Sequence, residues 1–128
     1  MYLPHARYAL ESDLVQKDED NRINVEWRFG MCLFSDGRYI EAEISFVQVM
    51  ETRKRVLGME HPSTLASMNN LAFTRKGQDR DKEAITLMKE CVQLRERVLG
   101  PDHHLTSSSR LVLNRWESNN VKLVSSNV

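Results

Sequence analysis

The sequence has little of what turn-rich, disulfide-built or membrane proteins need. It holds 5 glycines and 3 prolines, too few for a β protein with many tight turns. Its two cysteines, Cys32 and Cys91, lack CxxC spacing, so two buried free thiols in a reducing cytosol are favoured over a disulfide. Its apolar runs are only a few residues long, and no segment is predicted to span a bilayer.

Charge of either sign is not in excess either. The 18 basic residues balance the 18 acidic ones, so the formal net charge is +0 at pH 7. A neutral chain offers no field to collect phosphates or anionic lipids, which argues against nucleic-acid and membrane partners. The first residues lack the apolar stretch of a secretory signal, and a cytoplasmic location is expected.

Motifs for catalysis are also missing. The chain contains no Gly-rich phosphate loop, no HExxH and no GxSxG. Only His103 and His104 lie close together among the histidines, and a metal site would need further ligands such as Glu60 or Asp102. Both carboxylates are expected in loops, as helix caps. The sequence therefore predicts no catalytic, cofactor-binding or metal-binding residue, and a protein that is not an enzyme.

What the chain does contain is an internal repeat. RKRVLGMEHPST at 53–64 aligns with RERVLGPDHHLT at 95–106, an offset of 42 residues. Between 38–64 and 80–106, ten of the 27 aligned pairs are identical, where one or two would match by chance. A fixed period of this size is the signature of a stacked-repeat architecture.

Each period contains two helical patterns of apolar residues joined by a short turn, which predicts antiparallel helix pairs. Gly58 and Gly100 can end the second helix of each pair, and Pro62 fits the first turn of the next helix. The acidic run at 17–20 is expected to be a loop. The prediction is an all-α solenoid of about six helices, at 2–16, 22–35, 38–57, 62–77, 80–99 and 104–118.

The motif RKRVLGMEHPSTLASMNNLA at 53–72 makes the chain similar to a known family. It resembles the tetratricopeptide repeats of the kinesin light chain type, and its sequence at 37–43 and 93–103 is nearest to the arrays of fungal NOD-like receptors. The resemblance implies one solenoid over 1–118, with a half unit at 1–16, units at 22–58 and 62–100, and a half unit at 104–118. Residues 119–128 are expected to be a frayed tail.

The family architecture also implies a peptide-binding groove lined by the first helix of each pair, with Asn70 as a clamp for a peptide backbone. The expected groove residues are Trp27, Arg28, Met31, Phe34, Ala66, Asn69, Asn70, Phe73, Lys76, Leu111, Val112 and Arg115. Met31, Phe34 and Phe73 could instead be core between repeats, and Trp116 is read as a core or end-capping aromatic.

The expected function is a non-catalytic scaffold that binds a protein or peptide, as a fragment of a larger signalling receptor. A cargo adaptor of the kinesin light chain kind and a self-associating structural element are the alternatives. Both ends are expected to expose apolar side chains and to promote self-association, because their helices lack a partner helix. The apolar residues concerned are Leu3, Tyr8, Leu10, Leu14 and Val15 at one end and Leu111, Leu113 and Trp116 at the other.

Overall fold

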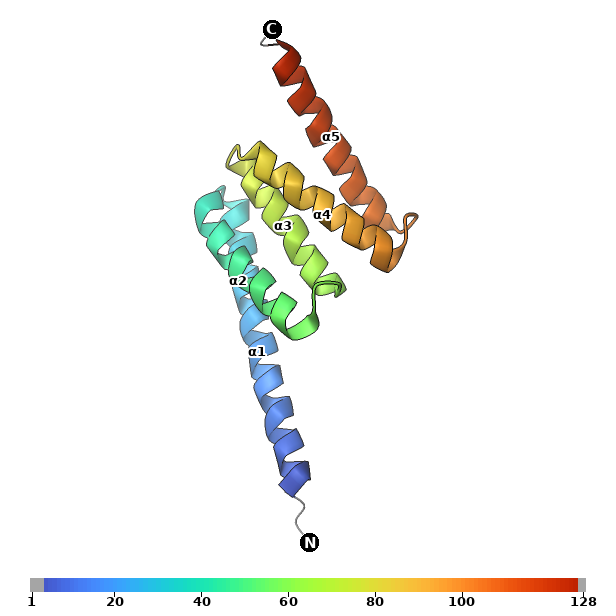
Figure 1. Cartoon of the computed structure of the whole chain (residues 1–128). Coiled ribbons are helices and arrows are strands. Elements are labelled where there is room, and N and C mark those ends of the chain that lie inside the picture. The colour runs from blue at the N-terminus through green and yellow to red at the C-terminus, as the bar shows by residue number, and fades with distance from the viewer. Residues whose placement is uncertain (1–3, 127–128) are drawn as a thin grey trace.

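The chain forms a row of antiparallel helices, described by a computed structural model that covers the backbone of residues 4–126 and the side chains of 17–18 and 20–120. Over these residues it has five α-helices and no strand: α1 Pro4–Ser35, α2 Tyr39–Leu57, α3 Pro62–Gly77, α4 Asp81–Leu99 and α5 His104–Ser126. Each helix packs against the next one along the chain, as Figure 1 shows. The predicted all-α solenoid is confirmed.

The core lies on both sides of α3, the central helix. One cluster joins α1, α2 and α3 through Leu33, Ala42, Phe46 and Leu71. The other joins α3, α4 and α5, and its buried members include Leu65, Met68, Met88, Cys91, Leu113 and Trp116. Each large apolar side chain buried here contributes about 1.5–3 kcal/mol relative to exposure. Because both clusters share α3, the two repeat units form one continuous core.

Glycines with positive φ end α2 and α4, as predicted. Gly58 has φ 94° and Gly100 has φ 96°, a region that residues with a Cβ rarely adopt. After each glycine a histidine caps the next helix: His61 Nδ1 accepts from Ser63 N–H, and His103 Nδ1 accepts from Leu105 N–H. This loop therefore recurs with the same chemistry in both repeats.

The predicted loop at 17–20 is wrong, because α1 runs unbroken through it. One period before Gly58 the sequence has Gln16, and one period before Pro62 it has Asp20. Neither the residue that permits positive φ nor the proline that starts a new helix is present, so the helix continues. The separate helix expected at 2–16 becomes the first part of one long helix, and residues 1–3 lie outside the described part.

The predicted tail from 119 is also helical, since α5 continues to Ser126 and only 127–128 lie outside the description. The α3–α4 turn passes through Asp79 with φ 60°, and one period later the chain has Val121. A β-branched residue resists that backbone conformation, so the corresponding turn does not form.

Both cysteines are free, but only Cys91 is buried as expected, whereas Cys32 is exposed. Cys32 lies on a face of α1 that no other described helix covers. One period later, the equivalent Thr74 is buried. The prediction of two buried thiols is therefore wrong for Cys32, because it assumed a covering helix.

Candidate peptide-binding groove

A small apolar pocket opens between α1, α2 and α3. Its volume is about 150 Å³, and it is lined by Met31, Phe34, Phe46, Asn69, Asn70 and Phe73. Five of these residues are predicted groove residues, and they come from two helices that are first in their pairs. Phe46, on α2, was missed by the sequence reasoning because its helical spacing marks only a core position. We call these six residues the aromatic pocket.

The aromatic side chains of the pocket serve both the core and the opening. Met31 and Phe34 pack against the first core cluster and Phe73 against the second, yet all three are only half-buried. Phe73 also meets the ring of Trp116 edge to face, with centroids 5.2 Å apart. Trp116 is 6% exposed, which agrees with its interpretation as a core aromatic. These residues therefore both pack against the core and line the pocket.

Asn69 is held in place by a hydrogen-bond chain from the next repeat. Arg95 donates to Ser109 Oγ at 2.6 Å, and Ser109 Oγ donates to Asn69 Oδ1 at 3.2 Å. Arg95 is itself buried and also donates to the Leu105 carbonyl. One wall of the pocket is therefore positioned by the α4–α5 interface.

The side-chain amide of Asn70 is uncommitted, by contrast. It makes no hydrogen bond with any described residue, while the Asn70 main-chain carbonyl accepts from Thr74 Oγ1 at 2.8 Å. The residue is half-buried at the pocket wall. A primary amide carries donors and an acceptor at once, which is the complement of a peptide group.

The other predicted groove residues do not line the pocket. Trp27 packs on the first core cluster, and its buried Nε1 has no partner among the described residues. Arg28 is exposed beside it, and Ala66 is half-buried. Lys76 forms an ion pair with Asp81 at 3.0 Å and sits 6.0 Å from the Trp116 ring centroid. Its charge is therefore already partnered.

The α5 members of the predicted set lie apart from the pocket too. Leu111 is 68% exposed, Arg115 is exposed, and Val112 packs against the second core cluster. Of the three α5 side chains expected to be open, only Leu111 is. Leu113 and Trp116 are buried, since α4 and α3 cover them.

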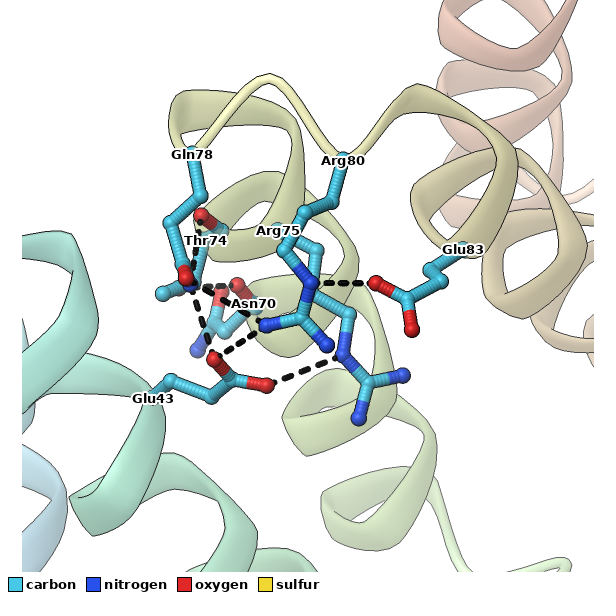
Figure 2. Close-up of polar contacts among 7 residues, drawn as sticks. All are labelled: Glu43, Asn70, Thr74, Arg75, Gln78, Arg80 and Glu83. Atoms are coloured by element: carbon cyan, nitrogen blue, oxygen red, sulfur yellow. Dashed lines mark hydrogen bonds and ion pairs between the residues drawn. The ribbon is translucent and has the colours of Figure 1, made fainter.

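A polar cluster around Glu43 fastens α2 to the α3–α4 turn, as Figure 2 shows. The Glu43 carboxylate accepts from Arg80 at 2.6 Å, from Gln78 at 2.9 Å and from Arg75 at 3.2 Å. Burial works to raise the pKa of Glu43, but the hydrogen bonds from Gln78 and Arg75 and the charge of Arg80 outweigh it. The pKa of Glu43 therefore lies below its ordinary value.

This cluster was not predicted, because Ile85 stands one period after Glu43 and the repeat gives no signal for it. A larger hollow of about 400 Å³ lies close by, at residues 37–41 and 77–78. Tyr39 is the one aromatic residue in its lining, and its walls include the exposed ion pair of Arg38 with Glu41.

Among the described residues, no group of three or more His, Cys, Asp or Glu side chains is arranged to hold a metal ion. The stacked pair His103 and His104 has ring centroids 4.5 Å apart, but no carboxylate completes a site there.

No helix in the described part of the chain is both long enough and apolar enough to cross a membrane.

Comparison with known proteins identifies the repeat. The tetratricopeptide repeat family model matches residues 29–63 and again 64–105. The chain belongs to the tetratricopeptide repeat family. The two matches meet between Ser63 and Thr64, in the first turn of α3 and just after the glycine–histidine loop that separates the units. Tetratricopeptide repeats are protein-interaction scaffolds and typically non-catalytic, so this chain is a scaffold for protein interaction.

Two curated relatives show where such repeats occur. A nucleotide-binding leucine-rich repeat (NLR)-like protein of Hyaloscypha variabilis is 44% identical over 69 residues, 53% of this chain and 7% of that protein. The human mitochondrial tetratricopeptide repeat protein 19 is 26% identical over 107 residues, 78% of this chain and 28% of that protein. This chain therefore spans only a small part of either relative.

The fold agrees with kinesin light chain-like repeats in crystal structures. The nearly identical TPR-like repeats of a Podosopora anserina protein of that kind superpose with a TM-score of 0.69 at 26% identity. The match covers 79% of this chain and 48% of the other, and a point variant of that protein gives the same values.

Proposed function

We propose that the chain binds an extended peptide in the groove around the aromatic pocket. The observation that carries this proposal is the pocket itself, where Met31, Phe34, Phe46 and Phe73 surround space for one apolar side chain beside two amides. Burying an apolar side chain there contributes about 25 cal/mol per Å². The uncommitted Asn70 amide would meanwhile bond to the peptide backbone on both sides.

The charges at the edge of the groove favour an acidic flank on the peptide. Arg28, about one turn before Met31 on α1, is exposed, whereas Lys76 already pairs with Asp81. An exposed arginine offers a planar set of donors that matches a carboxylate. We therefore expect bound peptides to combine one large apolar residue with nearby aspartate or glutamate.

The test is a peptide selected from a random library on the immobilised chain, then labelled and titrated by fluorescence anisotropy. Asn70→Ala should weaken its binding by about tenfold, the value of one good hydrogen-bonded contact. Helicity and melting temperature should stay unchanged, because this amide bonds to nothing within the fold. Asn114→Ala, the same change at an exposed position of α5, is the matched control and should bind as the parent chain does. Unfolding of Asn70→Ala, or unchanged binding, would contradict the proposal.

We further propose that these repeats are the sensor region of a larger NLR-type signalling protein in the cytoplasm. The 44% identity to the NLR-like relative supports this reading. The superposition on kinesin light chain-like repeats favours the alternative, a cargo adaptor. The transcript upstream of Met1 separates them: a nucleotide-binding domain in frame supports the receptor, and a coiled-coil segment supports the adaptor.

A further inference from the structure

The outer face of α1 is equivalent to faces that are covered in α3 and α5, but no other described helix covers it. In α3 and α5, the equivalent face is packed against the helix that precedes it, and Leu71 and Leu113 on this face are 0% and 9% exposed. The residue one period before Leu71 is Phe29, which is 56% exposed, and Val25 one turn earlier is 66% exposed. The internal repeat thus shows that this position in the fold is normally covered.

Because α1 is one continuous helix, no other described segment turns back onto this face. In the other units, a glycine loop turns the preceding helix back onto this face. Here α1 continues through 17–20, and its first part points away from the body of the protein, as Figure 1 shows. Residues 4–16 therefore extend in line with the face rather than folding onto it.

The exposed face carries a regular pattern along α1. Asp18, Arg22, Val25, Phe29 and Cys32 follow at steps of four, three, four and three residues, the spacing of a helix–helix seam. All five are exposed. Two of them are apolar and large, and the first two have opposite charge.

The exposed face of α1 also lacks the serine that accepts a hydrogen bond at the internal junctions between repeats. At both internal junctions an arginine of the preceding helix donates to a serine: Arg53 to Ser67 and Arg95 to Ser109. At the open face, Val25 stands in place of the serine, and the sequence one period before Arg53 has Glu11. A preceding repeat of the same design would therefore find no serine partner for its arginine.

We propose that this face pairs with the α1 helix of a second copy of the chain, in antiparallel orientation. When two helices spanning Pro4–Ser35 overlap along nearly their full length, the register that keeps this face inside places Asp18 opposite Arg22 of the other copy. The twofold symmetry makes this pairing twice, because Arg22 then also faces the second Asp18. In this register Val25 and Phe29 of each copy face the helix of the other copy. The charge complementarity selects the antiparallel partner.

The dimer also gives the protein a property beyond peptide binding in the groove. The groove opens on α1 and α3 at Met31 and Asn70, on a different face of α1 from Val25. Two grooves are thus joined by one rigid helix pair. A ligand that carries two peptide motifs would bind more tightly through avidity.

The experiment is sedimentation equilibrium of the full chain over roughly a hundredfold range of concentration. The parent chain should be a dimer that dissociates on dilution. Phe29→Glu should raise the dissociation constant by at least about tenfold without loss of helicity, because Phe29 is exposed within the single chain. Leu111→Glu, the same kind of change at an exposed apolar residue of α5, is the control and should leave the dimer intact.

Charge reversal tests the orientation. Asp18→Arg and Arg22→Asp should each weaken the dimer, because each places like charges opposite one another. The double variant should regain most of the parent affinity, since the pair is restored with its signs exchanged. A chain that is monomeric throughout the range contradicts the proposal. A dimer that survives Phe29→Glu, or a double variant no stronger than either single one, contradicts it as well.

Discussion

Arg95 donates a hydrogen bond to Ser109 Oγ at 2.6 Å inside the α4–α5 interface, and Arg53 makes the same bond to Ser67 Oγ at 2.9 Å one period earlier. Each arginine also donates to a main-chain carbonyl of the following helix, that of Leu105 or of Ser63. Both arginines belong to the arginine-rich helix ends by which the repeat is recognised in the sequence. Their hydrogen bonds join neighbouring repeat units. Ser109 also donates a hydrogen bond to Asn69, so the Arg95–Ser109 contact extends to the candidate groove.

Ser109→Ala should lower the free energy of unfolding by about 1–3 kcal/mol, because it leaves the buried Arg95 short of one acceptor and Asn69 short of one donor. Ser108→Ala, at the exposed neighbouring position, should change it by less than about 0.5 kcal/mol. Urea denaturation followed by circular dichroism measures both. Equal stability of the two variants would show that the Arg95–Ser109 hydrogen bond does not stabilise the fold.

Glu43→Gln should flatten the acid limb of the stability curve. The pKa of Glu43 is lowered in the folded chain, so its ionised form stabilises the fold above the ordinary glutamate pKa of 4.5. That contribution is lost as the pH falls through the lower folded-state value. The variant should therefore be less stable near neutral pH and lose less stability on acidification.

Glu41→Gln is the control for this pH series, because Glu41 pairs only with Arg38 on the surface of α2. Its unfolding curves should follow those of the parent chain at each pH. A Glu43→Gln variant with the same acid limb as the parent would contradict the role given to the cluster in Figure 2.

Gly30→Ala should destabilise the α1–α2 contact, although alanine favours helix. A Cβ at position 30 would lie 2.8 Å from Phe46 Cε1 and 3.2 Å from Ser45 Cβ. Overpacking of this kind costs about 1–3 kcal/mol, more than the roughly 1 kcal/mol gained in helix propensity. Thermal unfolding should show a lower midpoint than for Ser35→Ala on the same helix. A raised midpoint would mean that Phe46 moves aside freely.

The two thiols should differ sharply in reactivity. Burial raises the pKa of the Cys91 thiol, which packs against the Leu65 carbonyl with its sulfur 3.5 Å away, whereas Cys32 is exposed. At low protein concentration, maleimide should label one cysteine per folded chain and both after denaturation. Peptide mapping by mass spectrometry should find the native label on Cys32. Rapid native labelling of Cys91 would contradict its place in the core.

The sequence predicted the fold wherever a residue type dictates local geometry. Gly58, Gly100 and Pro62 mark helix boundaries by their backbone chemistry. It failed at 17–20 and after 119, where the repeat was extended to positions that lack those residues. A period implies a loop only when the residues that build the loop recur with it.

The pocket could be predicted only in part, for a related reason. Helical spacing indicates which side chains share a face, and it brought Met31, Phe34, Asn69, Asn70 and Phe73 together correctly. Helical spacing does not indicate which neighbouring residues pair with a side chain and so keep it from lining the groove. Lys76 is held by Asp81, and Phe46 enters the pocket from the paired helix; both depend on distances between helices.

The aromatic pocket as a peptide site is tested most directly by NMR spectroscopy on the isotope-labelled chain. Titration with a peptide selected from the random library should shift the amide signals of Met31, Phe34, Asn69, Asn70 and Phe73 most strongly, with the side-chain NH₂ of Asn70 among them. The outer face of α2 at Ile40 and Ile44, exposed and apolar, should stay unchanged. Shifts centred on Ile40 and Ile44, with the pocket residues unmoved, would contradict the account.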